Sequence, residues 1–149
     1  QLDPSLSAVF AGTPEVSKVY TLEGGWASAT RGAGGWSGLL TEIVDGKGYW
    51  VYATANTTLT LHPKPPDPLA LPPSYSLTEG WHLIGYTSSL TTMPVQTYLS
   101  TLQGKWTSIY RYDVAKGWEV AKPGGLGFSH VELGRGYWMY LTSAGTLVP

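Results

Sequence analysis

Three histidines and ten acidic residues are the side chains in this sequence that could perform acid–base or metal chemistry. His62, His82 and His130 lie far apart, and none has a metal-type spacing to another histidine or to a carboxylate. Glu119 could meet Glu132 or Asp113 as a glycosidase pair does, but the spacing does not require it. There is no cysteine, no Gly-x-Ser-x-Gly elbow and no phosphate-binding loop. We therefore expect no enzyme activity, no bound metal and no cofactor.

Aromatic side chains are the abundant residues that could bind a ligand, with 7 Trp and 10 Tyr in 149 residues. Exposed Trp and Tyr faces can stack on sugar rings, while buried ones hold sheets together. Trp36 follows two glycines in a loop, and of all the aromatic residues it is the one we most expect to be exposed. The five candidates for glycan stacking are Trp36, Trp118, Trp26, Trp81 and Tyr86.

One aromatic motif occurs twice. Gly46-Lys47-Gly48-Tyr49-Trp50-Val51-Tyr52 returns as Gly134-Arg135-Gly136-Tyr137-Trp138-Met139-Tyr140, at an offset of 134 − 46 = 88 residues. Both copies read as a glycine turn that leads into a strand, and both are followed by a short second strand, at 58–61 and 146–148. The pattern predicts an internal duplication. Its recurring tyrosines and tryptophans are expected to be cross-strand core residues.

The elements before each motif also correspond. Residues 3–12 and 94–104 each have proline near the start, glycine at the end and apolar residues at helical spacing, which predicts a short helix. A hairpin follows each helix, 16–29 in the first copy and 106–121 in the second, and glycine-rich connections follow the hairpins. An apolar strand at 80–85 precedes the second helix. The first copy has no counterpart of this strand.

A proline-rich run separates the copies and favours an extended spacer. The domain prediction is therefore a first half at 1–62, a linker at 63–74 and a second half at 75–149. The predicted fold is mainly β, with two related halves, each a small antiparallel sheet with one short helix, packed as one sandwich- or barrel-like domain. The strand missing from the first half could come from a neighbouring subunit or a segment preceding Gln1. Alternatively, residues 71–79, with Leu71 and Tyr75, could fold back and supply it.

The composition indicates which partners and which cellular location to expect. Charged residues are 13% and the net charge is −1, which argues against nucleic-acid binding, and no apolar run is long enough to insert in a membrane. Few Lys and Glu, many Gly, Ser, Thr, Tyr and Trp, and no Cys favour an extracellular or cell-surface protein. Since Gln1 is not a natural start residue, we expect a processed or excised chain.

The second half resembles a repeat of secreted and cell-surface proteins of bacteria and archaea. The pattern is Gly-Trp-x-Leu-Ile-Gly, a helix opened by proline, a tyrosine-rich hairpin ending in Gly-Trp, and Gly-x-Gly-Tyr-Trp-x-Tyr. The second copy matches from Gly80 to Leu147, and the first from Pro4 to Leu61 without the opening strand. The resemblance implies a β-rich module attached to a larger surface or envelope protein, and it supplies no catalytic residues.

These observations predict a non-enzymatic structural or assembly module of an exported surface, filament or envelope protein. Its expected partners are other copies of itself or the rest of a larger surface protein, and a strand from a neighbour could complete it. The alternative is a carbohydrate-binding adhesion module that presents exposed Trp and Tyr rings to glycans.

Overall fold

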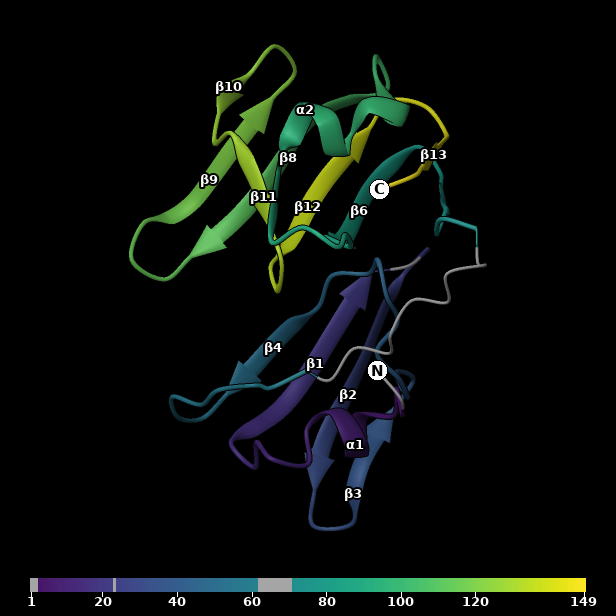
Figure 1. Ribbon diagram of the computed structural model, residues 1–149. Coiled ribbons are helices and arrows are strands. Elements are labelled where there is room, and N and C mark those ends of the chain that lie inside the picture. Colours follow the sequence, from purple (N-terminus) through teal and green to yellow (C-terminus); the bar gives the residue numbers. More distant parts are fainter. Residues whose placement is uncertain (1–2, 23, 62–70) are drawn as a thin grey trace. The chain divides into compact units, whose positions relative to one another are not determined.

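The computed structural model describes residues 3–22, 24–61 and 71–149, and it is mainly β with short helices, which confirms the predicted fold class (Figure 1). The chain forms two compact units. Unit 1 comprises 1–45 and 49–70, and unit 2 comprises 46–48 and 71–149. Part of the predicted linker, 63–70, lies outside the described residues.

Unit 1 contains one antiparallel sheet of four strands and one helix. Its elements are α1 (Leu6–Val9), β1 (Val16–Leu22), β2 (Trp26–Gly32), β3 (Gly35–Gly38) and β4 (Trp50–Ala53). The strand order is β3-β2-β1-β4, so that the hairpin of β1 and β2 lies at the centre. β3 lies within a stretch that the sequence suggested was a glycine-rich connection.

Unit 2 has the same arrangement with more elements. They are β5 (Tyr75–Leu77), β6 (Gly80–Gly85), β7 (Thr92–Pro94), α2 (Val95–Tyr98), the 3-10 helix η1 (Ser100–Leu102), β8 (Trp106–Asp113), β9 (Gly117–Lys122), β10 (Leu126–Gly127), β11 (His130–Glu132), β12 (Gly136–Leu141) and β13 (Gly145–Leu147). The main sheet has the order β10-β9-β8-β12-β6. Two further antiparallel pairs are β11 with β7 and β13 with β5.

The helices are shorter than the sequence suggested, at four residues each. Ser5 caps α1, since its hydroxyl accepts a hydrogen bond from the N–H of Ala8 at 3.3 Å. The Asp3 carboxylate instead accepts one from the N–H of Ser5 at 2.9 Å. Pro94 immediately precedes α2, as predicted, and the chain continues into η1.

Two of the sequence predictions for strands are wrong. The segment 58–61 forms no strand, and its Leu61 is half exposed. Residues 71–79 do not supply a strand to the first half, because β5 pairs with β13 in unit 2 through Ser76 opposite Thr146. Alternating Thr and Leu at 58–61 suits a strand, but a strand forms only where a neighbour satisfies its backbone groups.

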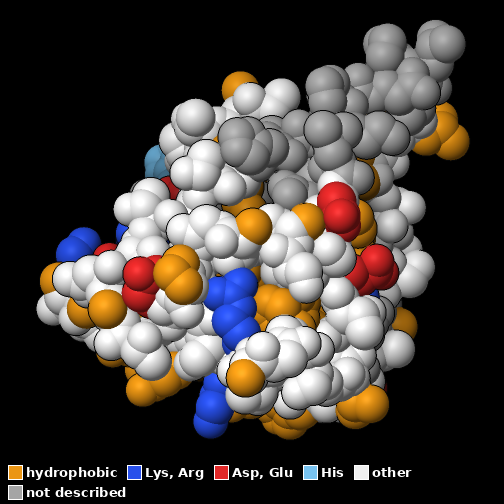
Figure 2. Space-filling model, turned by 90° about the horizontal axis from the view of Figure 1, so that it is seen from below, with side chains coloured by type: hydrophobic (Ala, Val, Ile, Leu, Met, Phe, Trp, Pro, Cys, Tyr) orange, Lys and Arg blue, Asp and Glu red, His pale blue; other side chains and the backbone are white. Residues whose placement is uncertain are grey.

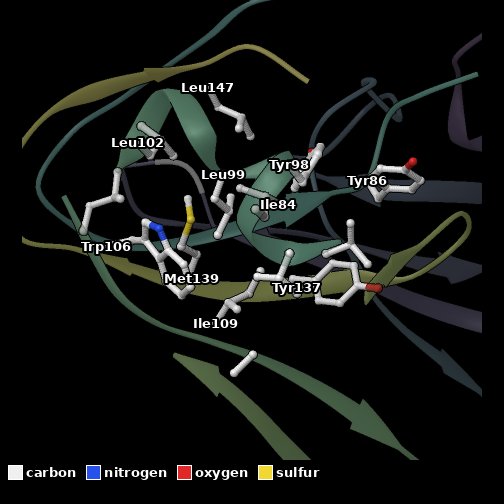
Figure 3. Packing of buried hydrophobic residues seen from close by; sticks show 14 residues of the cluster. Ile84, Tyr86, Tyr98, Leu99, Leu102, Trp106, Ile109, Tyr137, Met139 and Leu147 are labelled. Atoms are coloured by element: carbon white, nitrogen blue, oxygen red, sulfur yellow. The ribbon is translucent and has the colours of Figure 1, made fainter. Parts of the chain in front are cut away.

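Each unit has its own buried cluster. In unit 1 the buried residues are Leu6, Val9, Phe10, Val16, Val19 and Ala29. In unit 2 the cluster has 14 buried residues, and Figure 3 shows side chains of α2 and η1 gathered with those of β8 and β12. Among them Tyr98, Ile109, Tyr137 and Met139 are fully buried.

Hydrogen bonds outside the ladders recur in both units at nearly the same offset. The Leu6 N–H donates to the Thr41 carbonyl at 3.1 Å, and the Val95 N–H donates to the Ser129 carbonyl at 2.9 Å. The N–H and hydroxyl of Thr54 both donate to the Glu15 carbonyl, as those of Thr142 do to the Lys105 carbonyl. The sheets therefore share their strand order and the contacts that tie their loops to them.

Candidate functional site

The edge of the first sheet at β4 is where the two units differ most. β1 corresponds to β8, β2 to β9, β3 to β10 and β4 to β12, and in unit 2 the next strand is β6. Among residues 3–22, 24–61 and 71–149, no strand takes the place of β6 beside β4. The first sheet therefore ends one strand earlier than the second. A strand edge of this kind can pair with another chain.

The side chains of β4 are correspondingly uncovered. Val51 is 42% exposed, whereas Met139, its counterpart 88 residues later, is fully buried beneath α2 and η1. Ala53 is exposed, whereas Leu141 is buried. On the other face, Tyr52 is 58% exposed, while the ring of Tyr140 packs edge-on against Trp81 of β6 at 5.1 Å. Apolar surface that is covered in unit 2 is therefore open on β4.

The outer edge of β6 is paired in a different way. Gly46-Lys47-Gly48, which belongs to unit 2, lies along it: the Gly48 N–H donates to the Leu83 carbonyl and the Gly85 N–H donates to the Gly46 carbonyl, both at 2.9 Å. Lys47 forms an antiparallel bridge with Ile84. The glycine turn of the first motif copy thus extends the pairing of the opening strand of the second copy.

Glycine is required at these positions because the backbones approach so closely. A Cβ on Gly46 would overlap the ring of Tyr75, and one on Gly48 would lie 2.7 Å from the Ile84 carbonyl oxygen. Gly46 also has φ of 79°, a left-handed conformation that glycine adopts without strain. In the first copy, the two glycines of the motif therefore allow the turn to approach β6 and Tyr75 closely.

The outer face of the second sheet carries an aromatic cluster. Along β12 the side chains alternate, with Tyr137, Met139 and Leu141 in the core and Trp138 and Tyr140 on the opposite face. Trp81 of β6 contacts both of these rings, and its centroid is 5.8 Å from that of Tyr110. The expectation that all the motif aromatics pack in the core is therefore wrong, because a strand presents alternate residues to opposite faces.

The five glycan-stacking candidates separate into two groups. Trp26, Trp81 and Trp118 are 56%, 47% and 55% exposed. Trp36 and Tyr86 are not presented to solvent. The Trp36 ring is partly buried between Phe10, at 5.5 Å, and the guanidinium of Arg31, at 4.9 Å. Tyr86 is 4% exposed and packs edge-on against Tyr98.

The structure brings together the carboxylates that the sequence paired. Arg111 lies between Glu119 and Glu132, donating from Nε at 2.7 Å to the first and from Nη1 at 2.8 Å to the second. Arg135 donates to Glu132 at 2.9 Å and lies 3.4 Å from Asp113. The guanidinium of Arg111 also stacks over the ring of Phe128 at 4.6 Å. These carboxylates are therefore held as ion pairs on the hairpin of β8 and β9 and the β11 strand.

The groups around Glu119 and Asp113 favour the ionised forms of these two carboxylates. The hydrogen bond from Arg111 lowers the pKa of Glu119 below its usual value. The N–H groups of Ala115 and Lys116 lower the pKa of Asp113 in the same way. A glycosidase needs one carboxyl with a raised pKa, so that it stays protonated near neutral pH. The cluster is organised as a structural ion-pair network.

The described histidines make local contacts. His82 donates from Nε2 to the Thr78 carbonyl at 2.7 Å, and His130 Nδ1 lies 2.9 Å from the Ser129 hydroxyl. His62 lies outside the described residues. Within the described part of the chain, no three metal-ligating side chains converge and no helix is both long and apolar enough to cross a membrane. The face in Figure 2 shows hydrophobic side chains at several separate places and few charged ones.

Comparison with known proteins adds no assignment. No family model, curated protein or solved structure matches this chain.

Sequence reasoning missed the ion-pair network and the outward aromatic face. Both could have been found from strand register. With the hairpin turn at 114–116, Arg111 falls opposite Glu119, and Tyr112 falls opposite Trp118. Alternation along Tyr137–Leu141 would likewise have separated the core-facing ring from Trp138 and Tyr140.

Proposed function

We propose that this chain is a non-enzymatic structural module of an exported surface, filament or envelope protein, and that it assembles with neighbouring copies or repeats. One observation carries the proposal: among the described residues no strand pairs with the outer edge of β4, where the second sheet has β6, and apolar side chains on β4 are exposed. Association by addition of a strand uses such an edge, with backbone hydrogen bonds supplying affinity.

The module is proposed to be a duplicated β unit. The shared strand order, the recurring hydrogen bonds of the loops and the offset of 88 residues between the motifs support this origin. The pairing of Gly46-Lys47-Gly48 with β6 supports the idea that one copy of the motif is joined to the opening strand of the next. Backbone pairing between successive copies is expected in a tandem-repeat protein, in which each repeat is stabilised by its neighbours.

The extracellular or cell-surface setting belongs to the same proposal. It is supported by the low share of charged residues, the absence of cysteine and the resemblance of the Gly-Trp-x-Leu-Ile-Gly and Gly-x-Gly-Tyr-Trp-x-Tyr patterns to a repeat of bacterial and archaeal surface proteins. The ion pairs of Arg111 add to the argument for a structural role, because they neutralise the carboxylates that an enzyme would need.

Sedimentation velocity of the full chain tests the assembly. Between about 1 µM and about 1 mM the mean mass should rise reversibly if copies associate with the affinity typical of weak specific contacts. Val51→Lys should suppress the rise, because a charge on an edge strand opposes pairing. Val114→Lys is the matched control, since Val114 is 92% exposed in the hairpin turn between β8 and β9. A mass that stays monomeric throughout, or equal loss in both variants, contradicts the proposal.

Glycan binding is a second candidate function, because Trp26, Trp81 and Trp118 present rings to solvent. The relative orientation of the rings weakens it. Trp81 is tilted by 64° to Tyr140 and by 81° to Trp138, so the cluster does not form one flat platform for a sugar chain. A glycan array decides the question: binding that is lost in Trp118→Ala or Trp81→Ala, and kept in the internal control Trp36→Ala, would favour adhesion over assembly.

A further inference from the structure

We propose that the open edge of β4 receives an extended strand of the β6 type, Gly-Trp-x-Leu-Ile-Gly, supplied by a neighbouring repeat. This inference rests on the proposed assembly function and names the partner for its site. The occupant is identified by unit 2 itself, where β6 lies against β12 at the position that no described strand fills beside β4.

The register of the incoming strand follows from that of β6. Leu83 lies opposite Trp138 and Trp81 lies opposite Tyr140 in the antiparallel pairing of β6 with β12. Trp50 and Tyr52 of β4 correspond to Trp138 and Tyr140 of β12, 88 residues later. The leucine of the incoming strand should therefore lie opposite Trp50 and its tryptophan opposite Tyr52. The pairing stops before Gly48, because the N–H of Gly48 already donates to the Leu83 carbonyl.

The exposed side chains of β4 fit the two faces of such a strand. Its tryptophan would cover the ring of Tyr52, which is 58% exposed, as Trp81 packs on Tyr140 in unit 2. Its isoleucine, at the position of Ile84, would face the core beside Tyr49, as Ile84 lies opposite Tyr137 in unit 2. A strand with a polar residue in place of the tryptophan would leave the ring of Tyr52 uncovered, so the tryptophan of the β6 pattern sets the specificity.

A donor strand can be supplied by extending the full chain. We would join a second copy of residues 75–90 directly ahead of residue 1, which reproduces the spacing between Gly85 and Pro94 of unit 2. Amide exchange at Val51 should slow by about tenfold or more, because its N–H faces the open edge, whereas the N–H of Thr54, and by alternation that of Tyr52, faces β1. The extension should also reduce self-association, because the edge is filled. The matched control carries the same 16 added residues in scrambled order, which leaves the β4 edge unaltered.

The outcomes separate the two proposals. Equal protection of Val51 by the native and scrambled extensions, or no gain with either, overturns the assignment of the β6-type strand. Protection of Val51 in the unextended oligomer, with association unchanged by the donor, also overturns it and assigns the edge to a second copy of β4. A chain that never self-associates, yet gains protection only with the native donor, supports the strand and contradicts self-assembly.

Discussion

The hydroxyl of Tyr137 accepts a hydrogen bond from the backbone N–H of Glu132 at 2.7 Å. Tyr49 accepts the same bond from Val44 at 2.8 Å. In each copy of the motif the bond links the tyrosine to a residue on the other side of the glycine turn. The tyrosine of Gly-x-Gly-Tyr-Trp therefore has two roles: its hydroxyl stabilises the preceding glycine turn, and its ring packs in the core.

Replacing either tyrosine by phenylalanine should destabilise the unit that contains it. Tyr137→Phe leaves the N–H of Glu132 without its acceptor, which costs about 1–2 kcal/mol of unfolding free energy. Tyr49→Phe should have the same effect on unit 1. Urea denaturation followed by tryptophan fluorescence measures both, and Tyr52→Phe, on an exposed side chain, should change stability by less than about 0.5 kcal/mol.

Two neighbouring glycines should respond very differently to alanine. Gly124 and Gly127 have φ of 84° and 91°, so alanine at either costs about 1–2 kcal/mol in backbone strain. Gly124 has open space around it, whereas a Cβ on Gly127 would overlap the Val120 carbonyl oxygen. Thermal melts should therefore show a far larger loss for Gly127→Ala. Equal losses would mean that the close approach of β9 and β10 is absent in solution.

Unit 1 should unfold before unit 2. Its buried cluster has six residues and that of unit 2 has 14, and each buried aliphatic or aromatic side chain contributes about 1.5–3 kcal/mol relative to an exposed one. In rising urea, amide exchange in β1 should lose protection at a lower concentration than exchange in β8. Simultaneous loss in both strands would indicate that the units unfold as one cooperative body.

Alkaline pH should destabilise unit 2 through Tyr98. Burial raises the pKa of this phenol to about 12, and its hydroxyl donates to the Gly85 carbonyl at 2.9 Å. Because the folded-state pKa lies above the unfolded value near 10, the contribution is complete below about pH 10 and is lost as pH rises towards about 12. Tyr98→Phe should flatten this part of the stability profile measured by urea midpoints, although burial also raises the pKa of Tyr137.

Acid should weaken the ion pairs of Arg111. The folded-state pKa of Glu119 lies below its unfolded value, so the contribution is present above about pH 5 and is lost as pH falls through the folded value. In a series of melts from pH 6 to 3, Glu119→Gln should reduce the slope. Glu79→Gln serves as a control on a carboxylate that is not part of the network. An unchanged slope in Glu119→Gln would show that other carboxylates govern the acid response.

The sequence predicted the hairpins and the helix positions well, because these depend on local signals. Gly24 and Gly117 provide the left-handed residues of the hairpin turns, and Pro94 immediately precedes α2. The segment 58–61 was predicted wrongly as a strand because strand formation depends on a partner elsewhere in the chain, and sequence alternation cannot supply it.

The candidate surfaces were harder to predict. The missing opening strand could be inferred from the alignment of the two copies, but the exposure of Val51 and Tyr52 follows only from where the sheet ends. Trp36 was misjudged, because a tryptophan beside glycines reads as a loop residue, whereas cross-strand pairing with Arg31 places it under a guanidinium. Side-chain partners across a sheet require the register, which the sequence gives only in the tight hairpins.

The pairing of Gly46-Lys47-Gly48 with β6 makes unit 2 discontinuous along the chain. During synthesis on the ribosome, this turn emerges well before residues 80–85 have been translated. The turn can pair with β6 only after the proline-rich run and residues 80–85 have left the exit tunnel. Cutting the chain within that run would separate the turn from the strand it pairs with. A carboxyl-terminal fragment that begins there would contain β6 without Gly46-Lys47-Gly48 along its outer edge.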